Sequence, residues 1–187
     1  LDNRQGLLQG DHTLNLSSLA NLDNRQGTLF AGQVFNLASG SFDNRGGTLG
    51  SDNLLTAHVA GQLLNQNGLV GAVGDLTLHF GSLDNQQQGR INSKANLVAS
   101  GGMFDNRNGI LAADKRAQLL ASSLDNRQGD FYAGQHLDLQ LGSGLNNANG
   151  VVRSDGSLNL LAGPVDNSSG GGTRRVGAPQ TPGHGPQ

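Results

Sequence analysis

A short motif, LDNRQG at its first appearance, recurs along the chain at an almost constant spacing. It stands at Leu1 and again at Leu22, and related segments occur at each later step. Successive copies lie alternately 21 and 20 residues apart, a mean period of 20.5 residues. Such a period is typical of solenoid repeats, in which each repeat forms one turn of a coil. The Asn present in every copy is Asn3, Asn24, Asn44, Asn65, Asn85, Asn106, Asn126, Asn147 and Asn167.

Between the motifs, apolar and polar residues alternate. Counted from the Gly that closes the motif, the second residue is apolar in every repeat, and the eighth and tenth are mostly Leu, Phe or Ala. A period of two is typical of strands with one buried face, and no helical stripe accompanies it. The residues at the second position are Leu8, Leu29, Leu49, Val70, Ile91, Leu111, Phe131 and Val152.

The pattern predicts an all-β fold, a right-handed parallel β-helix of triangular cross-section with about eight turns. Each turn is expected to contain three short strands, one leading into the motif and two after it. A unit of about 20 residues cannot bury its own apolar face, but stacked units bury it against their neighbours. Right-handed winding is expected from the crossover preference of parallel strands.

The chain divides into a repeat region, residues 1–170, and a tail, residues 171–187. The tail contains three of the four Pro and loses the alternation of the repeats, so we expect it to be disordered. Because the chain starts within a motif and without Met, we expect further turns to precede Leu1.

Composition argues against several classes of protein. The net charge of −2 offers no basic surface for nucleic acid, and the absence of Cys excludes disulfides and thiolate metal sites. No apolar run is long enough for a membrane helix, so we expect no membrane insertion. We expect no cofactor, no catalytic residues and no metal site.

The recurring Asn are expected to stack as a structural ladder. Identical amides on successive turns can hydrogen-bond along the axis, and Asn also tolerates the left-handed backbone of a tight turn. We therefore assign these residues a structural role in preference to ligand contact.

Two charged columns are expected to lie beside this ladder. The motif Asp forms a carboxylate column that is interrupted at Leu64 and Asn146, and Arg recurs two residues after it. Paired columns form a solvated edge, and a receptor or glycan strip is the alternative reading. Calcium capture is a further alternative, although the spacing differs from known calcium-binding repeats. The Arg of the possible surface-binding strip are Arg4, Arg25, Arg45, Arg107 and Arg127.

Four other side chains are candidates at outward-facing positions. His58 and His79 lie at equivalent positions of adjacent turns and could share a metal, but no third ligand is evident. Phe30 and Tyr132 should be isolated exposed aromatics, for which sugar stacking is conceivable.

The repeat resembles a known family. The segment LDNRQGTLFAGQVFNLASGSFDNRGGTLGSDNLL, residues 22–55, is similar to the haemagglutinin repeats of filamentous haemagglutinin-like exoproteins, and the resemblance covers about residues 1–170. The family includes two-partner-secreted adhesins and the stalks of contact-dependent growth-inhibition toxins. The resemblance implies export through an outer-membrane partner transporter and a location outside the cell or on its surface. It also implies contact with a host receptor, a glycan or a neighbouring bacterial cell.

The expected function is a non-enzymatic structural segment of a secreted filamentous adhesin. A toxin stalk is an alternative, and the domains beyond Gln187 would distinguish it from an adhesin. A polysaccharide-active β-helix enzyme is the rival from another class, since such enzymes use carboxylates converging in a groove. The repeats offer no long insertion to frame a cleft, and the largest irregularity is the extra Gln within residues 86–88.

Overall fold

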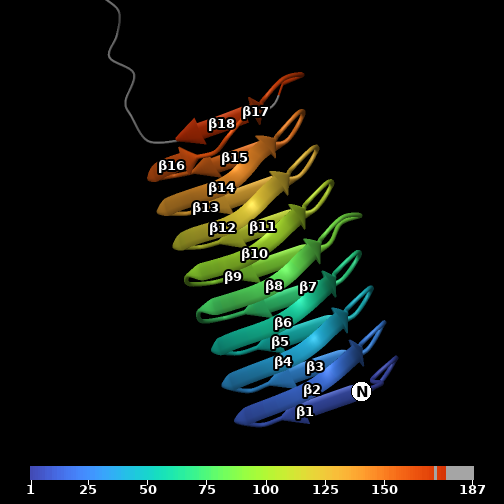
Figure 1. Ribbon diagram of the computed structural model, residues 1–187. Helices are drawn as coiled ribbons and strands as arrows, with labels where there is room; N and C mark the ends of the chain where they lie inside the picture. The colour runs from blue at the N-terminus through green and yellow to red at the C-terminus, as the bar shows by residue number, and fades with distance from the viewer. Residues whose placement is uncertain (171, 176–187) are drawn as a thin grey trace, which may run out of the picture.

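The computed structural model describes residues 1–170 and 172–175 and is built from strands. A short strand and a long strand alternate along the chain, so that one of each forms a turn (Figure 1). The short strands are β1 (Leu7–Gly10), β3 (Thr28–Ala31), β5 (Thr48–Ser51), β7 (Leu69–Ala72), β9 (Arg90–Ser93), β11 (Ile110–Ala113), β13 (Asp130–Ala133), β15 (Val151–Ser154) and β18 (Gly172–Arg175). The long strands are β2 (Thr13–Asp23), β4 (Val34–Asp43), β6 (Leu54–Leu64), β8 (Leu76–Asp84), β10 (Leu97–Asp105), β12 (Arg116–Asp125) and β14 (His136–Asn146).

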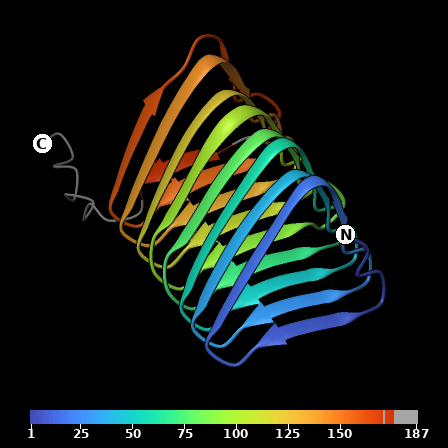
Figure 2. The ribbon, with the colours of Figure 1, turned by 60° about the horizontal axis from the view of Figure 1, so that its bottom comes forward.

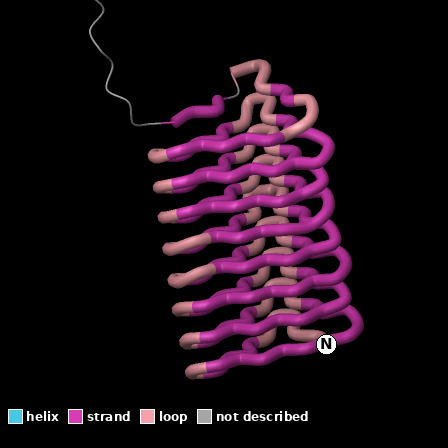
Figure 3. Tube along the Cα trace, turned by 60° about the vertical axis from the view of Figure 1, so that its left-hand side comes forward, coloured by secondary structure: helices cyan, strands magenta, loops and turns pink. Residues whose placement is uncertain are grey.

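The strands form two parallel sheets that run the length of the coil. One sheet has the order β1-β3-β5-β7-β9-β11-β13-β15-β18, and the other joins the long strands in sequence from β2 to β14 and on to β16 (Ser157–Leu161). Equivalent residues of successive turns pair directly, as Leu29 does with Leu49. The turns therefore stack one above another and their connecting loops align in columns (Figure 3).

The coil is right-handed and roughly triangular in section. In Figure 2 the N-terminal turn faces the viewer and the chain winds clockwise as it recedes. Each long strand bends at a corner and forms two sides of the triangle, and the short strand forms the third. The predicted all-β parallel β-helix of about eight turns is thus confirmed. The expected three short strands are two in the structure, because the strand leading into the motif continues the preceding one around this corner.

Turns of 20 and 21 residues alternate, and the extra residue of the longer turns is accommodated at one of two places. In three of the four longer turns, the pairing of the long strands shifts by one residue at or near the bend, as between Ser18 and Asn21. In the fourth, β10 pairs with β8 without a shift, because the extra residue lies in the motif turn at residues 86–88.

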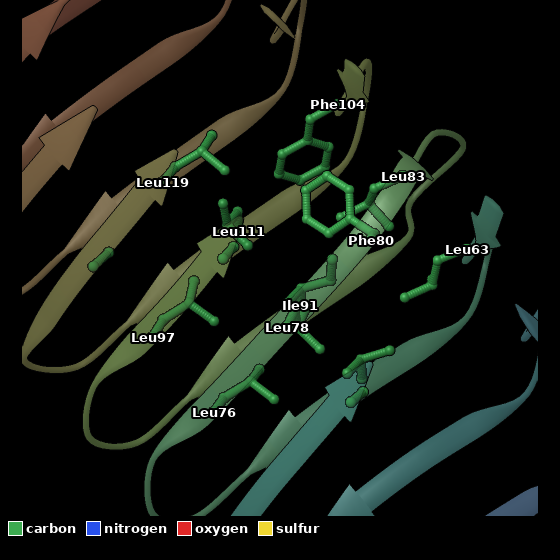
Figure 4. Close-up of a cluster of buried hydrophobic side chains, with 14 of the residues drawn as sticks. Leu63, Leu76, Leu78, Phe80, Leu83, Ile91, Leu97, Phe104, Leu111 and Leu119 are labelled. Carbon is green, nitrogen blue, oxygen red and sulfur yellow. The ribbon is translucent and has the colours of Figure 1, made fainter. Parts of the chain in front are cut away.

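The interior is a stack of aliphatic and Phe side chains. All second-position residues from Leu29 to Val152 are fully buried, as are most residues at the eighth and tenth positions. Leu76 and Leu97 pair across neighbouring strands, and Leu78 follows two residues after Leu76 on the same inner face (Figure 4). The rings of Phe80 and Phe104 meet edge to face with centroids 5.9 Å apart. The predicted inward positions therefore form the core.

The last described turn differs from the others. Its long strand is divided into β16 and β17 (Val165–Asp166), both of which pair with β14. The expected tail begins at residue 171, but Gly172–Arg175 forms β18 and pairs with β15, so the paired region extends past the expected boundary. The rest of the expected tail, residues 171 and 176–187, lies outside the described residues.

We predict that stability depends on the inward Leu positions. Leu78 in β8 is fully buried, whereas Leu120, on the outer face of β12 in the same sheet, is 54% exposed. Leu78→Ala should lower the free energy of unfolding by about 2–5 kcal/mol, because it removes packed methyl groups and leaves a cavity. Leu120→Ala is the matched control and should cost less than about 0.5 kcal/mol. Urea denaturation followed by circular dichroism measures both, and equal losses would contradict the assigned inward and outward faces.

Candidate functional site

Each motif forms a tight turn that contains a residue in the left-handed conformation, and the turns at residues 86–88 and 168–170 contain two. In most motifs the N–H of the closing Gly donates to the carbonyl of the motif Asn, as Gly27 does to Asn24 at 2.9 Å, whereas Gly89 in the longer motif donates to Gln86. The residue before that Gly has a positive φ, for example 58° at Gln26. The left-handed conformation thus falls two positions after the ladder Asn, and the ladder Asn itself does not adopt it.

The structure places the nine motif Asn in one column, which lies inside the coil except at Asn167, where it is exposed. The side-chain Nδ2 of each donates to Oδ1 of the next at 2.7–2.8 Å, over all eight steps. The same Nδ2 of Asn24 lies 3.2 Å from the carbonyl oxygen of Gly27 in its own turn and 3.1 Å from that of Thr48 in the next. The seven Asn from Asn24 to Asn147 are fully buried, and these contacts satisfy their amides.

The closing Gly is required by the close stacking of the turns. A Cβ on Gly27 would lie 2.1 Å from the carbonyl oxygen of Asn3 on the turn before, and the same conflict occurs at Gly47 with Asn24. A side chain here would push the turns apart and break the Asn contacts. The Gly and the Asn of the motif therefore serve the same stacking contact.

The motif Asp and Arg form ion pairs at the outer edge of this turn. Asp23 Oδ1 accepts from the backbone N–H of Arg25 at 3.1 Å, and its carboxylate accepts from Nε and Nη2 of the same Arg at 2.7–3.1 Å. Arg25 Nε also lies 3.7 Å from Asp43 Oδ2 on the following turn. Each of the five Arg of the strip forms an ion pair with the Asp two residues before it in the same turn.

These contacts change the titration of the carboxylates. Hydrogen bonds from the side chain and the backbone N–H of Arg4 lower the pKa of Asp2 to about 2. The side-chain hydrogen bond from Arg25 likewise lowers the pKa of Asp23, against a smaller opposing effect of burial. The Arg25 guanidinium in turn has a raised pKa because of its bond to Asp23. The edge is therefore a row of paired charges at neutral pH.

The five Arg lie in two groups. Arg4, Arg25 and Arg45 are on consecutive turns, as are Arg107 and Arg127, and Gln66 and Gln86 occupy the equivalent positions between them. In this gap Asp84 accepts a hydrogen bond from Gln66 Nε2 at 2.6 Å. The predicted surface-binding strip is thus interrupted, and its guanidiniums already face carboxylates.

The two predicted His lie side by side on the long-strand sheet. Their ring centroids are 5.8 Å apart, and His79 Nδ1 lies 2.6 Å from Ser100 Oγ on the next strand. Within the described ranges, no group of three His, Cys, Asp or Glu is arranged to hold a metal ion.

The two predicted aromatic residues lie far apart on the short-strand sheet. Phe30 is half-buried and lies against the backbone of Gly50. Tyr132 is also half-buried, its hydroxyl donates to Asp155 Oδ2 at 2.6 Å, and the Arg153 guanidinium lies 4.2 Å from its ring centroid. The bond to Asp155 raises the pKa of Tyr132. Neither ring forms a free aromatic platform.

A hollow on the long-strand sheet was not predicted from the sequence. It has a volume of about 450 Å³ and lies over β10, β12 and β14. The alternation in the sequence indicates that charged residues of consecutive repeats point outward on this sheet. It does not show which of these residues lack a partner. The hollow is lined by Asn96, Leu97, Val98, Arg116, Ala117, Gln118, His136 and Asp138.

Two parallel sheets wound into one right-handed coil, with a buried amide column and a repeated turn, define a β-solenoid repeat protein. A model of the haemagglutinin repeat matches residues 1–103, 98–160 and 137–178. The chain therefore belongs to the haemagglutinin repeat family, as a filamentous haemagglutinin-like repeat protein, which confirms the resemblance noted from its motifs. No curated protein and no solved structure gives a significant match.

The described residues contain no helix that is long and apolar enough to cross a membrane.

We predict that the buried ladder contributes more to stability than an equivalent exposed pair. Asn106→Ala removes the donor to Asn126 Oδ1 and the acceptor of Asn85 Nδ2 inside the coil. It should lower the free energy of unfolding by about 2–3 kcal/mol, because buried polar groups lose their partners. The control is Asn36→Ala, since exposed Asn36 donates to Asn15 Oδ1 at 2.8 Å. Urea denaturation of both variants should show a loss of less than about 1 kcal/mol for the control. A smaller loss at Asn106 than at Asn36 would refute this role.

The ion-paired edge should make stability sensitive to acid. Since the folded pKa of Asp23 is lowered, its contribution is complete above the ordinary Asp pKa of about 3.9 and is lost as the pH falls through the lowered value. The free energy of unfolding in urea should therefore fall on acidification below about pH 4, and should fall less in Asp23→Asn.

The matched control for this experiment is Asp52→Asn. Within the described part of the chain, Asp52 has no side-chain hydrogen bond or ion pair, so this variant should keep the acid sensitivity of the wild type. Identical pH profiles for Asp23→Asn and the wild type would contradict the predicted contribution.

Proposed function

We propose that the chain is a non-enzymatic structural repeat segment of a secreted filamentous adhesin. The observation that carries the proposal is the haemagglutinin repeat match over the whole described coil. Its support in the structure is the regularity of the coil, in which each turn repeats the same contacts and extends the same outer faces. A solenoid of this kind adds length at low sequence cost and presents a repetitive surface to a partner.

The proposed location is outside the cell or on the bacterial surface, and the proposed route is an outer-membrane partner transporter. Both rest on the family, whose members are typically secreted adhesins. The proposed partners are a host receptor, a host glycan or a neighbouring bacterial cell. A stalk that presents a growth-inhibiting toxin would use the same coil and would differ in the domains attached to it.

The polysaccharide-active enzyme is the second candidate, and the arrangement of the carboxylates disfavours it. Glycoside cleavage by two carboxylates needs both to face one bond of the substrate. The Asp of the motif column instead lie in a line, and the five that precede an Arg are bonded to it. This line favours a stalk over a catalytic groove.

Adhesion of coated particles tests the proposal. Beads carrying the full chain should attach saturably to erythrocytes or epithelial cells, and free chain should compete with them. Beads carrying albumin, and beads carrying the heat-denatured chain, are the controls. Attachment no greater than that of albumin beads would refute the adhesive function for this segment.

The enzyme alternative is tested with the same preparation. Incubation with polygalacturonate, followed by an assay of reducing ends, should release no more product than the heat-denatured chain does. Time-dependent release would favour the enzyme and contradict the structural role.

A further inference from the structure

The hollow over β10, β12 and β14 contains charged and amide groups in a compact array. Val98, Gln118 and Asp138 lie in one row across the three strands, and Arg116 pairs in register with His136 in the row beside it. The volume of about 450 Å³ lies within the usual range for small-molecule sites, roughly 300–1,000 Å³.

Two of these side chains are held in place by the last strand of the sheet. His136 Nδ1 contacts Ser157 Oγ, and His136 Nε2 lies 3.0 Å from Asp138 Oδ2. Asp138 Oδ1 also accepts from Asn159 Nδ2 at 3.0 Å, and this bond is the main cause of its lowered pKa. Asp138 is therefore a fixed, ionised hydrogen-bond acceptor at one side of the hollow.

Of the remaining polar side chains of the hollow, Asn96 donates to Asp75 Oδ1 at 2.9 Å, and Arg116 and Gln118 are free among the described residues. Within the described ranges, neither Arg116 nor Gln118 has a side-chain hydrogen bond or an ion pair. Arg116 differs in this from the five Arg of the motif column, each of which is bonded to an Asp. A guanidinium with all its donors available is suited to binding a carboxylate through two parallel hydrogen bonds.

We propose that this hollow binds a sugar residue that carries a carboxylate. The carboxylate pairs with Arg116, and ring hydroxyls bond to the Gln118 amide and the Asp138 carboxylate. A simple anion would leave Asp138 facing a second negative charge, whereas a hydroxyl can donate to it. Val98, 38% exposed, offers an apolar contact for the ring face. The inference rests on the proposed adhesive function and names the chemistry that one face of the coil recognises.

The test compares two glycosides that differ only at the acidic group, methyl β-glucuronide and methyl β-glucoside. Titrations of the full chain with each, monitored by saturation-transfer NMR, give their dissociation constants. We expect the glucuronide to bind about tenfold tighter, because a hydrogen bond to a charged group adds roughly that factor. Arg116→Gln should abolish this preference while leaving the thermal melt unchanged, since the residue is exposed.

Arg90→Gln is the matched control. Arg90 is also exposed and without a side-chain partner in the described part of the chain, but it lies on the short-strand sheet away from this hollow. It should keep the wild-type preference. The proposal is overturned if the wild type binds both glycosides equally or neither, or if Arg90→Gln loses the preference as Arg116→Gln does.

The outcome separates this site from the adhesive function. If the coated beads attach to cells and Arg116→Gln has no effect on glucuronide binding, the site is wrong and the adhesive function stands. If the preference for glucuronide is found but the beads attach to no cell, the site stands and the adhesive function of the segment fails.

Discussion

The stacked turns depend on one constraint, that the buried Asn amide of each turn must lie directly against the amide of the next. A buried amide without its partner is costly, so the spacing of the ladder tolerates little change. Most of the variation in repeat length is found away from this column, at the bend of the long strand, and one extra residue lies beside the column in the motif turn at residues 86–88. Even there, Asn85 Nδ2 still lies 3.0 Å from the carbonyl oxygen of Gly89 and 2.7 Å from Asn106 Oδ1.

At the charged edge, too, the same contact is repeated from turn to turn. An Asp column alone would accumulate repulsion as turns are added, but most turns carry their own compensating Arg two residues along the chain. Because the compensation is local, it does not depend on the number of turns. Among the described residues the same pairing leaves few free cations; Arg116 is one of them on the long-strand sheet, and Arg90 is another on the short-strand sheet.

Much of this fold could be predicted because the same residue types recur at the same position of every repeat, so each stacking contact is indicated many times in the sequence. The period located the Asn column, and the alternation located inward residues such as Leu29 and Phe131. The continuous long strand could not be predicted, because Gly and Ser at the bend resemble a turn. The pairing of β18 was also missed, since Gly172–Arg175 lacks the apolar alternation. The hollow at Arg116 depends on which side chains find partners, and spacing along the chain does not contain that information.

The ladder also gives the coil an electrical direction. Backbone hydrogen bonds between turns point both ways, since Asn3 N–H donates forward to Asp23 and Asp23 N–H donates back to Leu1. The side-chain amides all donate forward, from each turn to the next one, because their NH₂ groups also face the carbonyls of the motif turn. Their dipoles therefore add along the axis, as peptide dipoles do in a helix. A coil made of nearly identical turns is in this way polar, with its negative end towards Asn3.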